Sequence, residues 1–137
     1  MTWRTVYDLR HDQLLVEQFQ DASLNRPGFG FKPEPDLFAS ANWWRAIDDG
    51  NLAVHTLDGT IARSYMAGHG DFPQFDFQSD DGKTSTWERR GDEDGYREGA
   101  RARVSYVIQH LKDDVALLPG QDRAVETVIK VDVEDPY

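Results

Sequence analysis

The sequence predicts a mainly β protein, in which residues 51–137 form a small antiparallel β-barrel and residues 1–50 form a helical and looped extension that packs on it. The last strand-like run, Val125–Glu134, alternates apolar or small side chains with mostly polar ones, and this period of two is typical of a half-buried strand. Similar shorter runs precede it, separated by turn-forming residues. The chain has 137 residues, a length that favours a single domain over 1–137.

A first helix is expected to begin after Asp12 and to run through Leu24. Asp12 is a good helix N-cap, and the apolar residues that follow it recur at helical spacing. The residues before Asp12 leave two interpretations open, because Trp3–Leu9 alternates like a short strand but also fits the beginning of one longer helix. Residues 25–35 are rich in proline and glycine, so we expect an extended loop there.

A second helix is expected over Ala41–Asp49. Ser40 or Asp36 can cap its N-terminus, and Gly50 stands where a left-handed C-terminal cap belongs. The two adjacent tryptophans of this helix are about 100° apart around its axis, so they cannot point at the same place. We expect one ring in the core and keep Trp44 as a candidate partner contact, with burial of both rings as the simpler alternative.

Six strand-like runs lie within the predicted barrel. Asp58-Gly59 is a strong hairpin dipeptide, so we expect a turn there, and Asp80-Asp81-Gly82 indicates another. The polar segment Gly91–Gly99 predicts a loop with a single helical turn. In the run Ala102–Leu111, we expect Val104, Tyr106 and Ile108 on one side. We expect Arg101 and Arg103 to share the outward face opposite Val104 and Tyr106. The expected strands are Leu52–Leu57, Thr60–Met66, Gln74–Gln78, Lys83–Arg89, Ala102–Leu111 and Val125–Glu134.

Residues 59–134 resemble an OB-fold, the five-stranded Greek-key barrel. The likeness lies in a first strand Gly59–Tyr65, a hairpin Phe75–Gly82 that continues into Thr84–Arg89, the approach Tyr96–Val104 to a fourth strand, and a closing strand Val125–Val133. It is a likeness of superfold rather than of family, and SH3-like or other small α+β barrels share these features. The resemblance implies a ligand surface across the second and third strands and the loops beside them.

Eight residues are candidates for binding a ligand or partner. The resemblance implicates aromatic residues of the second and third strands and the loop around His69–Phe72. Arg89 belongs to a stretch that mixes basic and aromatic residues, as single-strand nucleic-acid binders do, but acidic residues interrupt it and a mixed-charge barrel wall is the simpler alternative. The candidates are Trp87, Phe75, Phe77, His69, Asp71, Phe72, Trp44 and Arg89.

The chain is strongly acidic, with 15 basic and 25 acidic residues and a formal net charge of −10. This charge disfavours nucleic acid as a partner and favours a protein partner with a basic surface, or solubility alone. The chain contains no cysteine, no apolar leader at its N-terminus and no apolar run long enough to span a membrane. We therefore expect a soluble, cytoplasmic protein without a membrane partner, and the sequence specifies no oligomeric state.

Motifs for catalysis and metal binding are missing from the sequence. The four histidines share no metal-ligand spacing, the paired carboxylates fall at predicted turns or helix ends, and no nucleophile or phosphate-binding motif occurs. We expect no catalytic residue, metal or cofactor. The main hypothesis is a non-enzymatic, partner-recognition domain. The alternatives are a single-stranded nucleic-acid-binding OB-fold protein and a ligand cup or small enzyme with a site near His69, Asp71 and Trp87.

Overall fold

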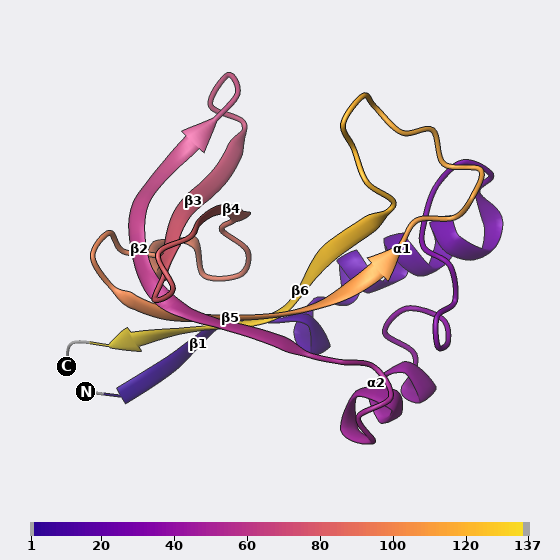
Figure 1. Ribbon diagram of the computed structural model, residues 1–137, viewed down its shortest axis with the longest axis horizontal. Helices are drawn as coiled ribbons and strands as arrows, with labels where there is room; N and C mark the ends of the chain where they lie inside the picture. Colours follow the sequence, from indigo (N-terminus) through magenta and orange to yellow (C-terminus); the bar gives the residue numbers. More distant parts are fainter. Residues whose placement is uncertain (1, 136–137) are drawn as a thin grey trace. The chain divides into compact units, whose positions relative to one another are not determined.

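The computed structural model describes residues 2–135 and confirms a mainly β fold with short helical elements (Figure 1). Its contacts group the residues into a sheet unit, 2–8, 56–105 and 129–135, and a helical unit, 9–55 and 106–128. The single domain expected over 1–137 stays a prediction. The strands are β1 (Thr2–Asp8), β2 (His55–Ala67), β3 (Phe72–Ser79), β4 (Thr84–Glu88), β5 (Arg101–His110) and β6 (Ala124–Asp135). The helices are α1 (Gln13–Asn25) and α2 (Ala41–Asp48), with 3-10 turns η1 (Leu9–His11) and η2 (Glu93–Gly95).

The strands form one sheet in the order β1-β6-β5-β2-β3-β4. Because β1 and β4 stand at opposite edges, the sheet is open, and the closed barrel expected from the sequence is wrong. The N-terminal residues form a strand, which settles the choice left open for Trp3–Leu9, and this strand pairs antiparallel with β6. The run Val125–Glu134 is a strand as predicted, but it lies between β1 and β5 instead of closing a five-stranded barrel.

The hairpin turn predicted at Asp58-Gly59 is wrong, because both residues lie inside the long strand β2. Gly59 is paired with Ser79 of β3, and a Cβ atom built on Gly59 would lie 2.7 Å from the Cα atom of Ser79. Glycine is therefore required here for the close approach of a neighbouring strand, not for a turn. Figure 1 shows that β2 bends part-way along its length, and its far end forms a tall hairpin with β3.

The core of the sheet unit lies on one side of the sheet. Phe75 packs against Tyr96 with 4.9 Å between ring centroids, and Phe77 meets Phe75 edge-on at 6.3 Å. The hydroxyl of Tyr96 donates a hydrogen bond to the carbonyl oxygen of Arg90 at 2.7 Å, and burial raises the pKa of Tyr96. The other buried side chains of this unit include Ile61, Trp87, Ala102, Val104, Ile129, Val131 and Val133.

Strand β5 departs from the predicted alternation. Ala102 and Val104 are buried, but the next buried residues are Val107 and Gln109, so the alternation changes phase by one residue. Ile108 is 37% exposed and does not share the buried side with Val104. The predicted grouping of Val104, Tyr106 and Ile108 on one side is therefore wrong.

Both predicted helices of the helical unit are confirmed. The carboxylate of Asp12 accepts a hydrogen bond from the backbone N–H of Leu15 at 3.3 Å and caps α1. The hydroxyl oxygen of Ser40 accepts from the N–H of Trp43 at 3.2 Å and caps α2. Gly50, with φ +78°, follows α2 in the left-handed conformation that the sequence predicted.

An aromatic cluster forms the core of the helical unit. Phe19 and Phe31 stack with 5.0 Å between centroids, and Phe38 contacts both rings. Phe38 also meets Trp43 at 5.1 Å, and Trp43 meets Trp44 edge-on at 4.9 Å. Such pairs add to the free energy gained by burying the rings. Trp43 is fully buried, as expected of one of the two tryptophans.

Candidate partner-binding face

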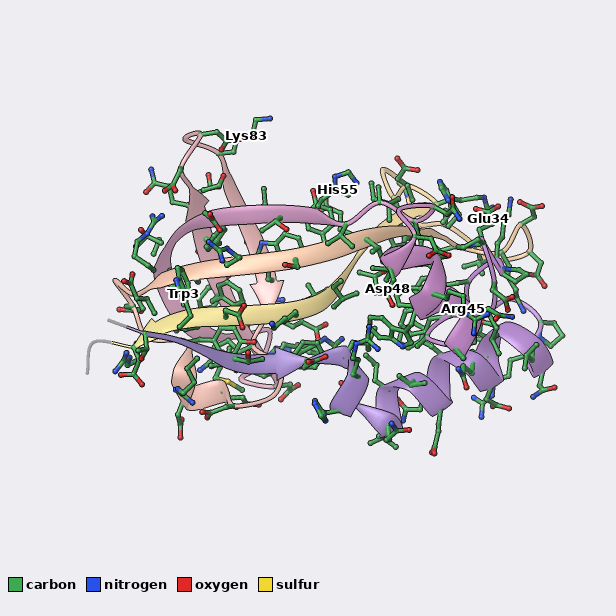
Figure 2. All side chains as sticks on the ribbon, turned by 90° about the horizontal axis from the view of Figure 1, so that it is seen from below. Trp3, Glu34, Arg45, Asp48, His55 and Lys83 are labelled. Atoms are coloured by element: carbon green, nitrogen blue, oxygen red, sulfur yellow. The ribbon has the colours of Figure 1, made fainter. Side chains whose placement is uncertain are left out.

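The side of the sheet opposite the core of the sheet unit presents a continuous face of polar and charged side chains. We call it the outer face. Side chains from four neighbouring strands, β1, β6, β5 and β2, form this face. Figure 2 shows the molecule from this side, and the side chain of Trp3 extends from β1 over the neighbouring strands. Its members are Trp3 and Thr5 from β1, Lys130, Asp132 and Glu134 from β6, Arg101, Arg103 and Ser105 from β5, and Asp58 and Thr60 from β2.

One row of side chains crosses these four strands. The guanidinium of Arg103 donates to Asp58, with Nε 2.7 Å from Oδ1 and Nη2 3.4 Å from Oδ2. The same guanidinium lies over the ring of Trp3, 4.8 Å from its centroid. Aromatic ring, cation and carboxylate thus fix one another, and the planar guanidinium is suited to both contacts.

A second ion pair borders this row. The two terminal nitrogens of Arg101 donate to the two carboxylate oxygens of Asp80, each at 2.7 Å. Both groups are largely exposed, so this pair orients side chains more than it stabilises the fold. The hydrogen bonds from Arg101 hold the pKa of Asp80 below its ordinary value.

Replacing Arg101 with alanine is expected to raise the pKa of Asp80 toward its ordinary value. Asp80 has the lower pKa in the folded state, so the pair contributes stability at neutral pH, and this contribution is lost as the pH falls through the folded pKa. NMR titration of side-chain carboxyl carbons measures the shift. Asp81 is the internal control, because its pKa is lowered mainly by a hydrogen bond from Ser79 and should not move. An unchanged Asp80 would contradict this assignment.

Three predicted site residues lie together at the tip of the β2–β3 hairpin. His69 and Asp71 are exposed in the turn, and Phe72, the first residue of β3, is 57% exposed. Met66 of β2 is also exposed. Arg89, half-buried, donates to the carbonyl oxygen of Tyr65 at 3.1 Å, two residues before the end of β2, and so braces the hairpin close to its tip. A binding role for these residues stays a prediction.

Three other predicted site residues belong to the core of the sheet unit. Phe75 and Phe77 are fully buried, and Trp87 is 8% exposed. The indole N–H of Trp87 donates to the hydroxyl of Ser85 at 2.8 Å. Their binding role stays a prediction. In this structure almost none of the surface of the three rings is exposed for a partner to contact.

Trp44, the last predicted site residue, lies in the helical unit. Its ring is half-buried, and the guanidinium of Arg10 lies over it at 3.9 Å from the centroid. Of the two adjacent tryptophans, Trp43 is therefore buried and Trp44 is partly covered by Arg10. A partner contact by Trp44 stays a prediction.

Within residues 2–135, no group of three or more histidine and carboxylate side chains is placed to hold a metal ion. None of the helices described there has the length and apolar character needed to cross a bilayer.

Residues 3–134 match a protein family described as Immunity protein RhsI2. The chain belongs to the RhsI2 immunity protein family. The match covers nearly the whole chain, including both helices and all but the end residues Thr2 and Asp135 of the six strands described above. Among curated proteins, none matches the chain. Membership of the RhsI2 family implies a partner protein, the toxin, and agrees with the partner-recognition role expected from the sequence.

The alternative of a single-strand nucleic-acid binder is not supported for this RhsI2 family member. It required a closed OB-fold barrel, and the sheet is open. It also required the rings of Phe75, Phe77 and Trp87 to stack on bases, and these rings are in the core.

The outer face was only partly foreseen. The sequence placed Arg101 and Arg103 on the outward side of one strand, and the structure agrees. It did not single out Trp3, because the N-terminal residues fitted a strand or a helix equally well. The only signal was the alternation of Trp3 with its neighbours, which puts the ring on the face opposite the buried residues once β1 is known to be a strand.

Proposed function

We propose that this protein binds a toxin protein and blocks its activity, and that its acidic surface receives a basic surface of the toxin. The single observation that carries the first part is the family match over residues 3–134. An immunity protein of this kind needs no catalytic residue, because it acts by occupying its partner. The cytoplasmic location expected from the sequence stays a prediction.

The charge distribution supports a basic partner. The sheet unit has nine basic and fourteen acidic residues, and the helical unit has six and eleven, so each carries a net charge of −5. A negative field over both units attracts a positive surface and raises the association rate.

Several basic side chains already bind carbonyl oxygens or carboxylates of this chain, so the remaining carboxylates are in excess. In the helical unit, the ammonium of Lys112 donates to the carbonyl oxygens of Ala22, Ser23 and Arg26 at 3.0–3.2 Å. These carbonyls end α1, where the helix dipole favours a cation. In the sheet unit, Arg4 is paired with Asp92 at 2.7 Å.

Co-expression tests the function. A bacterial host that carries an inducible gene for the candidate toxin should lose viability on induction and regain it when this chain is co-expressed. The purified chain should bind the purified toxin directly. A wild-type chain that neither protects nor binds would overturn the proposal.

Salt dependence tests the charge part separately. We expect the association rate to fall by about tenfold or more as NaCl rises from about 0.03 M to about 0.3 M, because screening shortens the range of the field. Stopped-flow or surface plasmon resonance measures the rate. An association rate that does not fall with salt would refute electrostatic attraction and leave the inhibitory function in place.

A further inference from the structure

We infer that Trp3 and Glu134 together form the receptor for an arginine or lysine side chain of the toxin, at the centre of the contact on the outer face. This rests on the proposed function. The two residues are directly opposite each other in the β1–β6 register. Directly opposed residues in an antiparallel pair have Cβ atoms about 5 Å apart on the same face, so the ring and the carboxylate are neighbours.

Trp3 has the exposure and the chemistry of a binding anchor. It is 43% exposed, whereas Trp43 is fully buried and Trp87 is 8% exposed. A tryptophan left open on a folded surface is among the residue types that contribute most at protein interfaces. Its ring also attracts cations.

The ring of Trp3 is already held in place before any partner arrives. The guanidinium of Arg103 lies over the ring, 4.8 Å from its centroid, while Trp3 stays 43% exposed, and Asp58 holds Arg103 through a hydrogen bond of 2.7 Å. A ring fixed in this way loses little conformational entropy on binding, which favours affinity.

Within residues 2–135, Glu134 is the carboxylate on this face that is not paired with a cation. Asp58 and Asp80 are paired with arginines, and Asp132 accepts from Thr5 at 2.6 Å and lies 3.7 Å from Lys130. Among the described residues, the side chain of Glu134 forms no hydrogen bond or close ion pair. Its only electrostatic interaction with Arg101 is a longer-range Coulombic attraction, because Arg101 is paired with Asp80. A basic side chain that stacks on Trp3 would meet this free carboxylate and form a charge-assisted hydrogen bond.

The hairpin tip is the competing surface, and nothing in the structure shows what covers its apolar side chains. Phe72 there is 57% exposed, somewhat more than Trp3. Phe72→Ala therefore tests the competing surface, since it truncates an exposed aromatic residue of the same sheet unit away from the outer face.

The test is toxin affinity measured by surface plasmon resonance for four variants. Trp3→Ala should weaken binding at least about 30-fold, mainly through faster dissociation, as expected for a central anchor. Trp3→Phe should keep part of the affinity, and Glu134→Gln, which preserves shape, should weaken binding about tenfold. Phe72→Ala should change it less than about threefold. Circular dichroism melts verify folding, and Trp3→Phe and Glu134→Gln decide the question if Trp3→Ala does not fold.

Quenching by acrylamide gives an independent readout. The part of the tryptophan fluorescence that is lost in Trp3→Phe should be quenched readily in the free protein and protected when toxin is added.

The outcomes separate the two proposals. Tight binding by the wild-type chain with unchanged affinity in Trp3→Phe and Glu134→Gln overturns the Trp3–Glu134 receptor and leaves the proposed function intact. A loss of affinity in Phe72→Ala alone overturns it as well and moves the contact to the hairpin tip. No binding by the wild-type chain overturns both.

Discussion

Replacing Gly59 with alanine is expected to unfold the sheet unit or to leave it severely destabilised. The added methyl group would overlap the carbonyl oxygen of Gln78 and lie 2.7 Å from the Cα atom of Ser79 and 2.8 Å from the ring of Phe77. Two of these three neighbours are backbone atoms of β3, which cannot move aside without breaking the β2–β3 pairing. We expect a loss of at least about 3 kcal/mol in the free energy of unfolding, a large share of the about 5–15 kcal/mol typical of a domain.

Gly82→Ala is the matched control. Gly82 has φ +89° in the β3–β4 turn, and a Cβ atom there would meet nothing within 4 Å. Its substitution costs only the left-handed conformation of a non-glycine residue, about 1–2 kcal/mol. Urea denaturation followed by circular dichroism measures both variants. Equal stabilities would show that the close approach of β3 at Gly59 is not tight.

The same glycine shows why strand boundaries were hard to derive from the sequence. Asp-Gly is a strong local signal for a hairpin, and nothing near Asp58-Gly59 in the chain argues against it. The residues that demand a glycine are Gln78 and Ser79, about twenty positions further on. A glycine needed for a close approach and a glycine needed for a turn look alike until the partner strand is known.

Features set by neighbouring residues were predicted well. Asp12 and Ser40 cap their helices through hydrogen bonds that span three residues, and the alternation in β6 needs only the strand itself. The sequence wrongly predicted a closed barrel, because whether a sheet closes depends on which distant strands pair. Here β1 pairs with β6, from the two ends of the chain, and this pairing extends an open sheet.

The candidate site, like the fold, was predicted where neighbouring residues decide it and was missed where distant strand pairing decides it. The OB-fold resemblance implies a binding role for Phe75 and Phe77, but the alternation of a strand does not tell which of its sides is buried, and both rings lie in the core. The sequence does not single out Trp3, although this residue is 43% exposed on the outer face. Its position depends on β1 being a strand and on its pairing with β6, neither of which its own neighbours specify.

Replacing Trp43 with alanine is expected to be the most damaging single truncation in the helical unit. The ring is fully buried and lies between Phe38 at 5.1 Å and Trp44 at 4.9 Å, so its loss opens a cavity in the centre of the aromatic cluster. Truncations of this kind cost about 3–5 kcal/mol. Thermal and urea denaturation, read from circular dichroism, measure the loss.

Trp43→Phe is expected to cost much less than Trp43→Ala, for a reason specific to this site. Within the described residues the buried indole N–H of Trp43 has no hydrogen-bond partner, and an unpaired buried donor costs about 1–3 kcal/mol. Phenylalanine removes this donor, which offsets part of the lost packing. Leu118→Ala is the control, because Leu118 is 74% exposed and its truncation should change the free energy of unfolding by less than about 0.5 kcal/mol. If Trp43→Phe were as destabilising as Trp43→Ala, the indole N–H would have a partner that matters, and the cluster would owe its stability to that bond as well as to packing.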